Sequence, residues 1–264
     1  MPVLDIKNYV KEEKEKLKAA IVAMRRRPSL LIIQVGDNPA SNSYIKGKMA
    51  DCEEVGIKAT LMKHDEDWYY KHLDDVDVAI AAADAVILQL PVESIFLKGE
   101  ILGNIQPEQD VDGLQERSSF RPCTPLGILN YLTCGLKIDL AGKVVTVVGK
   151  GALVGGPLVP MLMARGATVI SCNSKTKDLK SMVRQADIII SAVGKANLID
   201  ADWIREGQIV IDAGTARDEN GKLCGDVDKR LYTANRCQVS SVPGGVGLLT
   251  RLQLLKHVVM AVRR

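Results

Sequence analysis

Short apolar runs alternate with amphipathic stretches along the whole sequence, and this alternation predicts an α/β fold with parallel strands joined by helices. Runs such as residues 30–35 (LLIIQV) and 85–90 (AVILQL) are almost uninterrupted, which indicates strands buried on both faces. The length of 264 residues fits one large domain or two modest ones. Together these observations favour a layered α/β molecule.

The first third predicts a small β/α unit. Apolar spacing indicates a helix over residues 6–24, which Pro28 stops, followed by the strand at 30–35. Ser41 is the expected N-cap of a helix that runs to Val55, where Gly56 ends it. Two more strands are expected over 57–61 and 85–90.

The middle third predicts a Rossmann-like succession of strands and helices. A strand at 143–148 leads into a glycine-rich turn at 149–156 and a helix at 158–165. The other expected elements are strands at 167–172, 187–193 and 208–212, a helix at 178–185, a turn at 243–247 and a closing helix at 248–262.

The charge balance argues against nucleic acid and membrane partners. There are 35 Lys and Arg against 32 Asp and Glu, a net charge of +3, which is too weak for a polyanion site. The basic stretch at 7–27 favours the solvated face of a helix over a polyanion site. No signal-peptide core and no run of ~18 apolar residues is present, so we expect a soluble, cytoplasmic protein.

Cysteine and histidine usage favours neither a disulfide scaffold nor a metal site. The six cysteines are far apart and lack zinc-site spacing, so we expect reduced thiols and no bound metal. The three histidines form no H-E-x-x-H motif.

The segment GKGALVG, from Gly149 to Gly155, lies between a predicted strand and a predicted helix. Glycines there let a pyrophosphate approach backbone amides at a helix N-terminus. An ordinary tight turn is the alternative, and the strand and helix context favours dinucleotide binding.

The next strand ends without the acidic residue that binds ribose hydroxyls in NAD sites. A hydroxyl and two cations, Ser174, Lys150 and Lys175, are available instead, and they suit the 2′-phosphate of NADP. The alternative, that they are plain solvated loop residues, remains open.

Tyr44 and Lys48 are four residues apart on one predicted helix face, so a phenol and an ammonium can converge on one ligand. A surface pair without function is the frequent alternative. Short-chain dehydrogenases also use Y-x-x-x-K, but there the motif follows the cofactor glycines, whereas here it precedes them.

Three further features lie at predicted element ends. Gln89 is an amide at the carboxyl end of an apolar strand, the end where α/β proteins bind ligands. Asp110 and Asp112 occupy a D-V-D-G turn without the rest of a calcium loop. The turn PGGVG, from Pro243 to Gly247, allows a close backbone approach or simply precedes the last helix.

Taken in order, these segments resemble the bifunctional methylenetetrahydrofolate dehydrogenase/methenyltetrahydrofolate cyclohydrolase family. The similar segments span nearly the whole chain: VGDNPASNSYIKGK (35–48), ILQLP (87–91), PEQDVDG (107–113), PCTPLGI (122–128), GKVVTVVGKGALVGGP (142–157), ATVISCNSKT (167–176), VIDAG (210–214), GDVD (225–228) and VPGGVG (242–247).

The resemblance implies two reactions and a role for each site residue. A hydride passes from 5,10-methylenetetrahydrofolate to NADP, and water then opens the methenyl product to 10-formyltetrahydrofolate, within one-carbon metabolism and purine biosynthesis. Lys48 would assist water attack and proton transfer, with Gln89 holding it. Tyr44 would stack on the p-aminobenzoate ring and Asp112 would bind the pterin N–H groups.

The resemblance also implies binding residues, domains and a homodimer. Folate contacts would include Leu88, Leu90, Pro243, Gly244, Gly245, Val246 and Gly247, and cofactor contacts would include Gly149, Lys150, Gly151, Ser174 and Thr215. The expected domains are a folate-binding catalytic domain at 1–120, to which a helix at 242–264 returns, and a Rossmann-like NAD(P)-binding domain at 121–241, with a cleft between them.

Some positions depart from the family pattern. The family usually has Arg-Ser where this chain has Lys150-Gly151, which removes a bidentate fork and a hydroxyl from phosphate recognition. The connection from Gly113 to Pro122, beside Asp112, is shorter than usual. Relaxation toward NAD and retention of only one activity are therefore the alternatives.

Overall fold

The computed structural model describes residues 3–262. Residues 1–2 and 263–264, which belong to the predicted folate-binding domain and its C-terminal helix, lie outside the described residues. Its contacts divide the chain into two compact units. We call residues 12–123 with 251–262 the lysine unit, and residues 3–11 with 124–250 the glycine-loop unit. Helices α1 (Ile6–Val22) and α9 (Val246–Val262) contribute residues to both.

This division differs from the predicted domains at the N-terminus and at the start of the last helix. The N-terminal residues belong with the glycine-loop unit because the Leu4 N–H donates to the carbonyl of Val239 (2.9 Å), beside a parallel bridge between Val3 and Val239. Val3 and Leu4 thus pair with the edge strand β10 (Gln238–Val239) of the larger sheet rather than with the smaller sheet.

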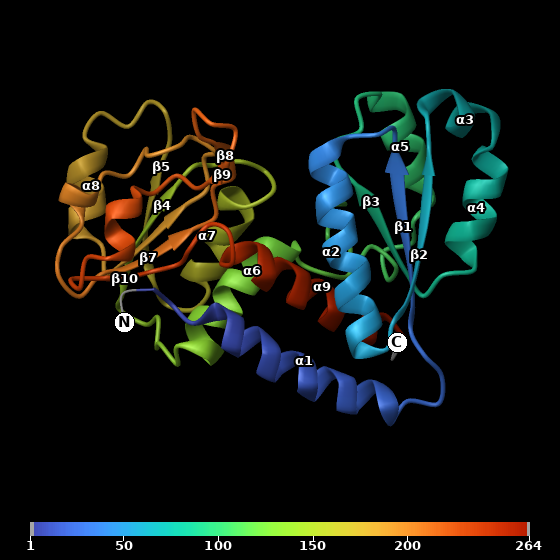
Figure 1. Cartoon of the computed structure of the whole chain (residues 1–264), viewed down its shortest axis with the longest axis horizontal. Helices are drawn as coiled ribbons and strands as arrows, with labels where there is room; N and C mark the ends of the chain where they lie inside the picture. Colours follow the sequence, from blue (N-terminus) through green and yellow to red (C-terminus); the bar gives the residue numbers. More distant parts are fainter. Residues whose placement is uncertain (1–2, 263–264) are drawn as a thin grey trace. The chain divides into compact units, whose positions relative to one another are not determined.

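The lysine unit contains a three-stranded parallel sheet of order β2-β1-β3. Its strands are β1 (Ser29–Val35), β2 (Lys58–His64) and β3 (Ala85–Gln89), and its helices besides parts of α1 and α9 are α2 (Pro39–Val55), α3 (Glu66–Lys71), α4 (Leu73–Ala81) and α5 (Ile95–Asn104). Figure 1 shows α2 on one side of this sheet and α4 on the other.

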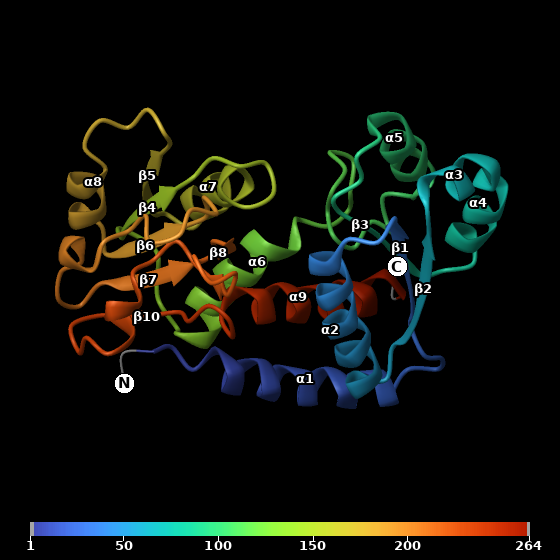
Figure 2. The same ribbon diagram turned by 45° about the horizontal axis from the view of Figure 1, so that its top comes forward.

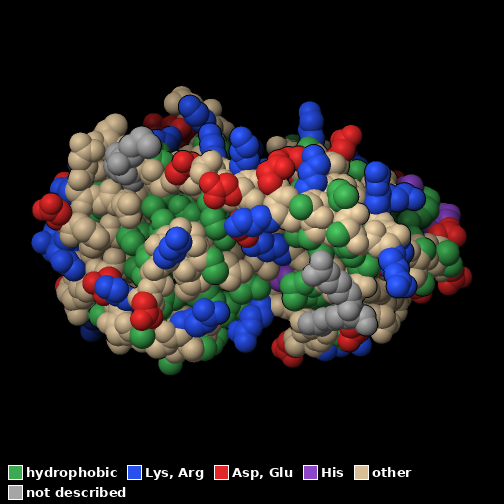
Figure 3. Space-filling model, turned by 90° about the horizontal axis from the view of Figure 1, so that it is seen from below, with side chains coloured by type: hydrophobic (Ala, Val, Ile, Leu, Met, Phe, Trp, Pro, Cys, Tyr) green, Lys and Arg blue, Asp and Glu red, His purple; other side chains and the backbone are tan. Residues whose placement is uncertain are grey.

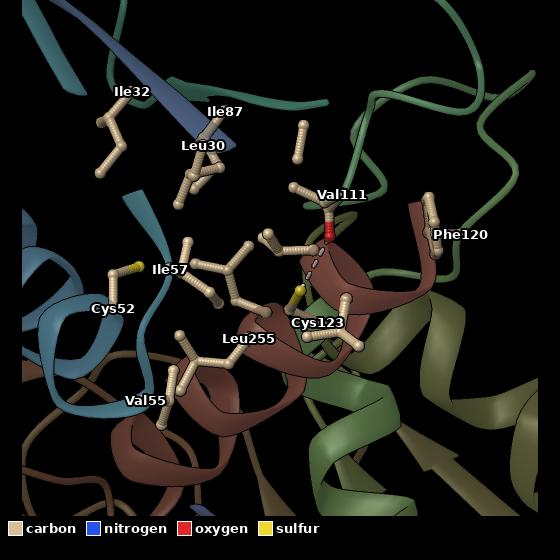
Figure 4. Close-up of a cluster of buried hydrophobic side chains, with 14 of the residues drawn as sticks. Leu30, Ile32, Cys52, Val55, Ile57, Ile87, Val111, Phe120, Cys123 and Leu255 are labelled. Carbon is tan, nitrogen blue, oxygen red and sulfur yellow. Dashed lines mark hydrogen bonds between the residues drawn. The ribbon is translucent and has the colours of Figure 1, made fainter. Parts of the chain in front are cut away.

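Side-chain alternation on β1 and β3 creates two apolar layers. Leu30, Ile32 and Ile87 face the layer completed by α2 and α9, where the thiol of Cys123 donates to the carbonyl of Val111 (Figure 4). The residues between them on the same strands, including Leu88, face the layer built by α3, α4 and α5. Each of these strand residues therefore packs in only one of the two apolar layers.

The glycine-loop unit contains a five-stranded parallel sheet of order β10-β7-β6-β4-β5 (Figure 2). The strands are β4 (Val144–Val148), β5 (Thr168–Cys172), β6 (Ile188–Ser191), β7 (Ile209–Asp212) and β10 (Gln238–Val239). The sheet lies between α7 (Gly155–Met163) and α8 (Leu179–Gln185). The other elements are α6 (Cys123–Asn130), the π-helical turn Tyr131–Gly135, the 3-10 turns Ala201–Trp203 and Lys229–Tyr232, and the hairpin β8 (Ala216–Arg217) with β9 (Leu223–Cys224).

The predicted N-cap of α2 was wrong. Asn38 caps this helix, because its side-chain oxygen accepts from the N–H groups of Ala40 (3.0 Å) and Ser41 (3.1 Å). Ser41 lies inside the helix, and its hydroxyl donates to the carbonyl of Leu90 (3.2 Å). The C-terminal stop at Gly56 is confirmed by its left-handed conformation, with φ of 92°.

Surface charge is mixed rather than segregated on one face of the molecule. On the face drawn in Figure 3, Lys and Arg side chains are interspersed with Asp and Glu. All six cysteines are free thiols, and Cys134 alone among them is exposed. Among the described residues, no helix is both long enough and apolar enough to cross a bilayer.

Candidate functional site

Lys48 lies on α2 and is almost completely buried, with 2% of its surface exposed. Its ammonium group donates to the side-chain oxygen of Gln89 at 3.1 Å and lies 3.7 Å from a carboxylate oxygen of Asp112. The ring of Tyr44, one turn earlier on the helix, lies 5.0 Å from the same nitrogen. Four residues predicted from the sequence therefore come together around one buried charge.

The secondary structure explains why Lys48 and Gln89 meet. Gln89 is the last residue of β3, and alternation places it on the same face as Ile87, the face that α2 covers. Its amide nitrogen donates to the carbonyl of Leu90 (2.9 Å), which leaves its oxygen directed to the lysine. The backbone thus fixes which end of the amide Lys48 meets.

Asp112 is held by the short connection that follows it. Gly113 has φ of 68°, and a Cβ there would lie 2.7 Å from the backbone at Arg121 and Pro122. The connection therefore folds back tightly against the turn. Two residues upstream of Asp112, the buried carboxylate of Asp110 accepts from the N–H of Gln115 (2.9 Å), so a hydrogen bond also joins this turn to the connection that follows it.

Sequence reasoning did not single out Cys123 and His257. The Cys123 thiol lies 3.5 Å from Nδ1 of His257, and that nitrogen is 2.8 Å from the carbonyl of Val111. Burial raises the pKa of Cys123 well above its usual value, and the nearby charge of Asp112 raises it further. The thiol is therefore an uncharged neighbour of the lysine site. In the sequence, Cys123 lies in the PCTP segment, which is the signal that could have identified it.

The arrangement around Lys48 combines a proton carrier with a ligand acceptor. A lysine held by an amide and a carboxylate can hold and deliver a proton at one fixed position. Asp112 remains 23% exposed, so its oxygens can accept from N–H groups of a ligand. This chemistry suits a planar polar substrate that undergoes proton transfer.

In the glycine-loop unit, close backbone contacts explain two glycines of the turn after β4. A Cβ on Gly149 would lie 2.5 Å from the carbonyl oxygen of Ala192, and one on Gly155 would lie 1.8 Å from that of Gly149. Gly151 has open space around it and is exposed. The turn leads directly into α7, as a pyrophosphate site requires.

The segment after β5 forms a second tight turn at the same sheet edge. The Asn173 N–H donates to the hydroxyl of Thr176 (3.0 Å), and the Lys175 N–H donates to the side chain of Asn173 (2.9 Å). Ser174 is exposed at the tip. Burial raises the pKa of Cys172, and a hydrogen bond with Thr176 and the charge of Lys150 oppose this rise.

Thr215 is exposed in the turn that follows β7. Because β4, β5, β6 and β7 are parallel neighbours, their carboxyl ends share one sheet edge. That edge carries all five predicted cofactor residues: Gly149, Lys150, Gly151, Ser174 and Thr215. It includes the carboxyl ends of the neighbours β4 and β6, between which the strand order reverses, the usual ligand position in such folds.

The residues predicted to contact folate come from both units. The side chain of Leu88 is buried in the layer of α3 to α5, away from the lysine face, so its predicted folate contact remains a prediction that would have to involve its backbone. Leu90 is half-buried, and its carbonyl receives the bonds from Gln89 and Ser41. The turn from Pro243 to Gly247 belongs to the glycine-loop unit, where Gly244 has φ of 95°.

Two family models match this sequence. The catalytic-domain model, tetrahydrofolate dehydrogenase/cyclohydrolase, matches residues 4–112, and the NAD(P)-binding-domain model of the same family matches residues 122–264.

Similar proteins and structures cover almost the whole chain. The bifunctional protein FolD of Anoxybacillus flavithermus is 39% identical over 268 residues, covering 96% of this chain and 94% of that protein. The crystal structure of a FolD enzyme from Campylobacter jejuni has a TM-score of 0.88 at 37% identity, covering 99% of this chain and 98% of that one. A Trypanosoma brucei enzyme complexed with NADP and an inhibitor has a TM-score of 0.89 at 28% identity, with 99% and 97% coverage. With both domain models matched and such relatives aligned end to end, the chain belongs to the tetrahydrofolate dehydrogenase/cyclohydrolase family.

Proposed function

We propose that this protein oxidises 5,10-methylenetetrahydrofolate with NADP and then hydrolyses the methenyl product to 10-formyltetrahydrofolate. In the first step a hydride leaves the methylene carbon for the nicotinamide, which leaves a methenyl cation and NADPH. In the second, water adds to that cation, a carbon–nitrogen bond opens, and one proton is released. The observation that carries this proposal is the buried ammonium of Lys48 between Gln89 and Asp112.

Each residue has a task that its geometry supports. Lys48 assists proton transfer as water attacks, and Gln89 keeps the ammonium in place through the 3.1 Å bond. Asp112 accepts from N–H groups of the pterin, which fixes the ring. Tyr44 stacks on the p-aminobenzoate ring, and the turn at 243–247 with Leu90 contributes further folate contacts.

The carboxyl edge of the larger sheet would bind NADP. The turn from Gly149 to Gly155 receives the pyrophosphate at the start of α7. Lys150 and Ser174 supply a charge and a hydroxyl for the 2′-phosphate, and Thr215 lies at the same edge. The lysine replaces a bidentate arginine fork with a point charge, so we expect NADP to be preferred over NAD by a modest factor.

A spectrophotometric assay tests this function. Oxidation of 5,10-methylenetetrahydrofolate is followed with NADP and with NAD in parallel, and decay of the methenyl absorbance is then followed without cofactor. We expect both activities, with the higher kcat/KM for NADP. Turnover in only one assay would assign a single activity, and saturable folate binding without turnover would contradict catalysis.

We also infer a cytoplasmic homodimer that supplies formyl groups to purine biosynthesis. Within the described residues β2 pairs only with β1, and its exposed Leu61 lies on an open strand edge that a second copy can cover. Sedimentation of the wild type against Leu61→Lys tests the dimer: the substitution should shift the protein toward monomer.

A further inference from the structure

Two aspartates of the glycine-loop unit are fully buried without a cationic partner. Asp212 ends β7, and Asp226 follows β9; both have 0% of their surface exposed. Within residues 3–262, no Lys, Arg or His lies within ion-pair distance of either carboxylate. A carboxylate buried in this way is costly unless hydrogen bonds surround it.

The carboxylate of Asp226 accepts four hydrogen bonds from the segment that follows β6. The donors are the hydroxyl of Ser191 (2.7 Å) and the backbone N–H groups of Val193 (2.7 Å), Gly194 (2.8 Å) and Lys195 (2.7 Å). One oxygen receives the first two and the other oxygen receives the last two. A single side chain therefore fixes the course of the loop at 192–195.

Asp212 holds Asp226 in turn. Its carboxylate accepts from the N–H groups of Asp226 and Val227, each at 3.0 Å, and from that of Gly214, also at 3.0 Å. It thereby connects the turn after its own strand to the backbone of Asp226. The two aspartates form one unit in which Asp212 orients Asp226 and Asp226 orients the loop after β6.

Two glycines allow this close packing. A Cβ on Gly214 would lie 2.1 Å from a carboxylate oxygen of Asp226, and one on Gly225 would lie 1.9 Å from an oxygen of Asp212. The carboxylates therefore lie directly against the two backbone segments, with no room for water or a side chain between them.

The loop that Asp226 fixes contacts two of the proposed cofactor residues. A Cβ on Gly149 would lie 2.5 Å from the carbonyl oxygen of Ala192, and one on Gly194 would lie 3.4 Å from that of Thr215. Residues 192–195 thus connect the glycine-rich turn after β4 with the turn after β7. A change in the path of this loop therefore displaces the glycine-rich turn after β4, the turn after β7, or both turns.

We propose that Asp226, oriented by Asp212, is a positioning residue of the NADP site: it acts through the loop at 192–195 and touches neither substrate. The inference rests on the proposed function for the identity of the cofactor. It assigns to a buried carboxylate pair the task of setting the spacing between Gly149 and Thr215, on which nicotinamide cofactor binding depends.

The test is Asp226→Asn, which keeps side-chain size and removes one acceptor oxygen. The NH2 end of the asparagine amide must face either the N–H of Val193 or the N–H groups of Gly194 and Lys195. Because NH2 is only a donor, it can accept a hydrogen bond from none of them. We expect KM for NADP and Kd for NADPH, measured by fluorescence titration, to rise about tenfold or more. Cyclohydrolase kcat/KM, which needs no cofactor, should stay within about twofold.

A control for the same substitution at an exposed position is Asp187→Asn. Asp187 accepts from the N–H of Val144 (2.9 Å) at the amino edge of the same sheet, so it tests the loss of a carboxylate bond away from the cofactor edge. We expect its KM for NADP to be unchanged. Equal losses of both activities in Asp226→Asn with unchanged KM and Kd, or no change at all, would overturn the proposal.

If Asp226→Asn does not fold, Ser191→Ala decides instead. It removes one of the four bonds and leaves the three backbone donors in place, so about a threefold rise in Kd for NADPH is expected; an unchanged Kd would contradict the inference. NADPH binding is measured in every variant, so a wild type that binds NADPH without oxidising folate would refute the proposed reaction and leave this positioning role testable.

Discussion

In the lysine unit the candidate chemistry rests on side chains, whereas in the glycine-loop unit it rests on backbone. Lys48, Gln89 and Asp112 bring an ammonium, an amide and a carboxylate together from three separate segments. At the edge of the larger sheet, glycines let neighbouring backbone segments contact one another directly. Two buried aspartates accept hydrogen bonds from the backbone N–H groups of these loops.

This difference predicts two kinds of failure. A side-chain site loses its reaction when one group is replaced, while the fold around it survives. A backbone site loses ligand affinity when the loop path changes, because the groups that bind the ligand are amides common to every residue. The variants below separate these two outcomes by measuring cyclohydrolase activity, NADPH affinity and stability on the same preparations.

The largest effect is expected for Lys48→Met. It keeps the length of the side chain and removes the ammonium at the Gln89 oxygen, so hydrolysis of the methenyl substrate should fall by about 10²- to 10⁴-fold. NADPH affinity should be unchanged. The exposed Lys46→Met on the same helix is the control and should retain full activity; an unaltered hydrolysis rate in Lys48→Met would remove the lysine from the mechanism.

Gly155→Ala should show the opposite pattern. The added methyl would lie 1.8 Å from the carbonyl oxygen of Gly149, so the turn must move, at about 1–3 kcal/mol. We expect NADPH Kd to rise about tenfold or more, with cyclohydrolase activity retained. Gly99→Ala, on α5 of the lysine unit, has open space around it and is the control that should leave Kd unchanged. If Gly155→Ala binds NADPH like the wild type, the glycine-rich turn is not the pyrophosphate site.

Gln89→Leu tests the support of the lysine rather than the lysine itself. Loss of a hydrogen bond to a charged group is typically about 1.5–3 kcal/mol, so cyclohydrolase kcat should fall by roughly ten- to a hundredfold. Gln34→Leu is the control, because Gln34 pairs with Gln89 across β1 and β3 but its amide donates to Asn42 (2.8 Å). Equal kcat losses in both would indicate general disturbance of the sheet.

A gradual effect is expected in the pH dependence of stability. Burial raises the pKa of Asp212 from 3.8 to about 6, although backbone N–H groups oppose the rise. Between these values the unfolded chain loses a proton that the folded chain keeps, so stability falls as pH rises through about 6, by at most about 3 kcal/mol.

Urea unfolding of the wild type and Asp212→Asn at pH 4 to 7 isolates this contribution. The difference in unfolding free energy should shift against the wild type with rising pH, and a constant difference would contradict the raised pKa. Asp84→Asn is the control: the Arg26 guanidinium bonded to Asp84 lowers the pKa of that carboxyl, so its difference should change only below about pH 4.

Local sequence signals predicted much of the framework. The buried strands at β1, β3 and β4, the stop at Gly56 and the turn before α7 follow from apolar runs and glycines whose physics is local. Helices α3, α4 and α5 were not predicted. They are short, and much of their stability comes from the apolar layer that they share with β1 and β3, which forms only after packing.

The site was predictable to a different degree in each unit. The order of the motifs identified Lys48, Gln89 and Asp112 as site residues. The residue types alone did not, because Tyr44 and Lys48 could equally have been a surface pair without function. The burial of the Leu88 side chain away from Lys48 and the omission of Cys123 have the same origin: which face a strand residue takes, and which distant residue lies beside it, depend on the pairing of segments.

By itself the sequence determined the α/β class, the family and the residue types available for chemistry, because periodicity, turn glycines and ordered motifs are written along the chain. Tertiary structure alone decided that Lys48 is buried against Gln89 and Asp112, and that Asp226 reaches the loop after β6. These contacts join residues that are 31 to 64 positions apart, and only the packing of helices on sheets brings such residues within hydrogen-bond or ion-pair distance.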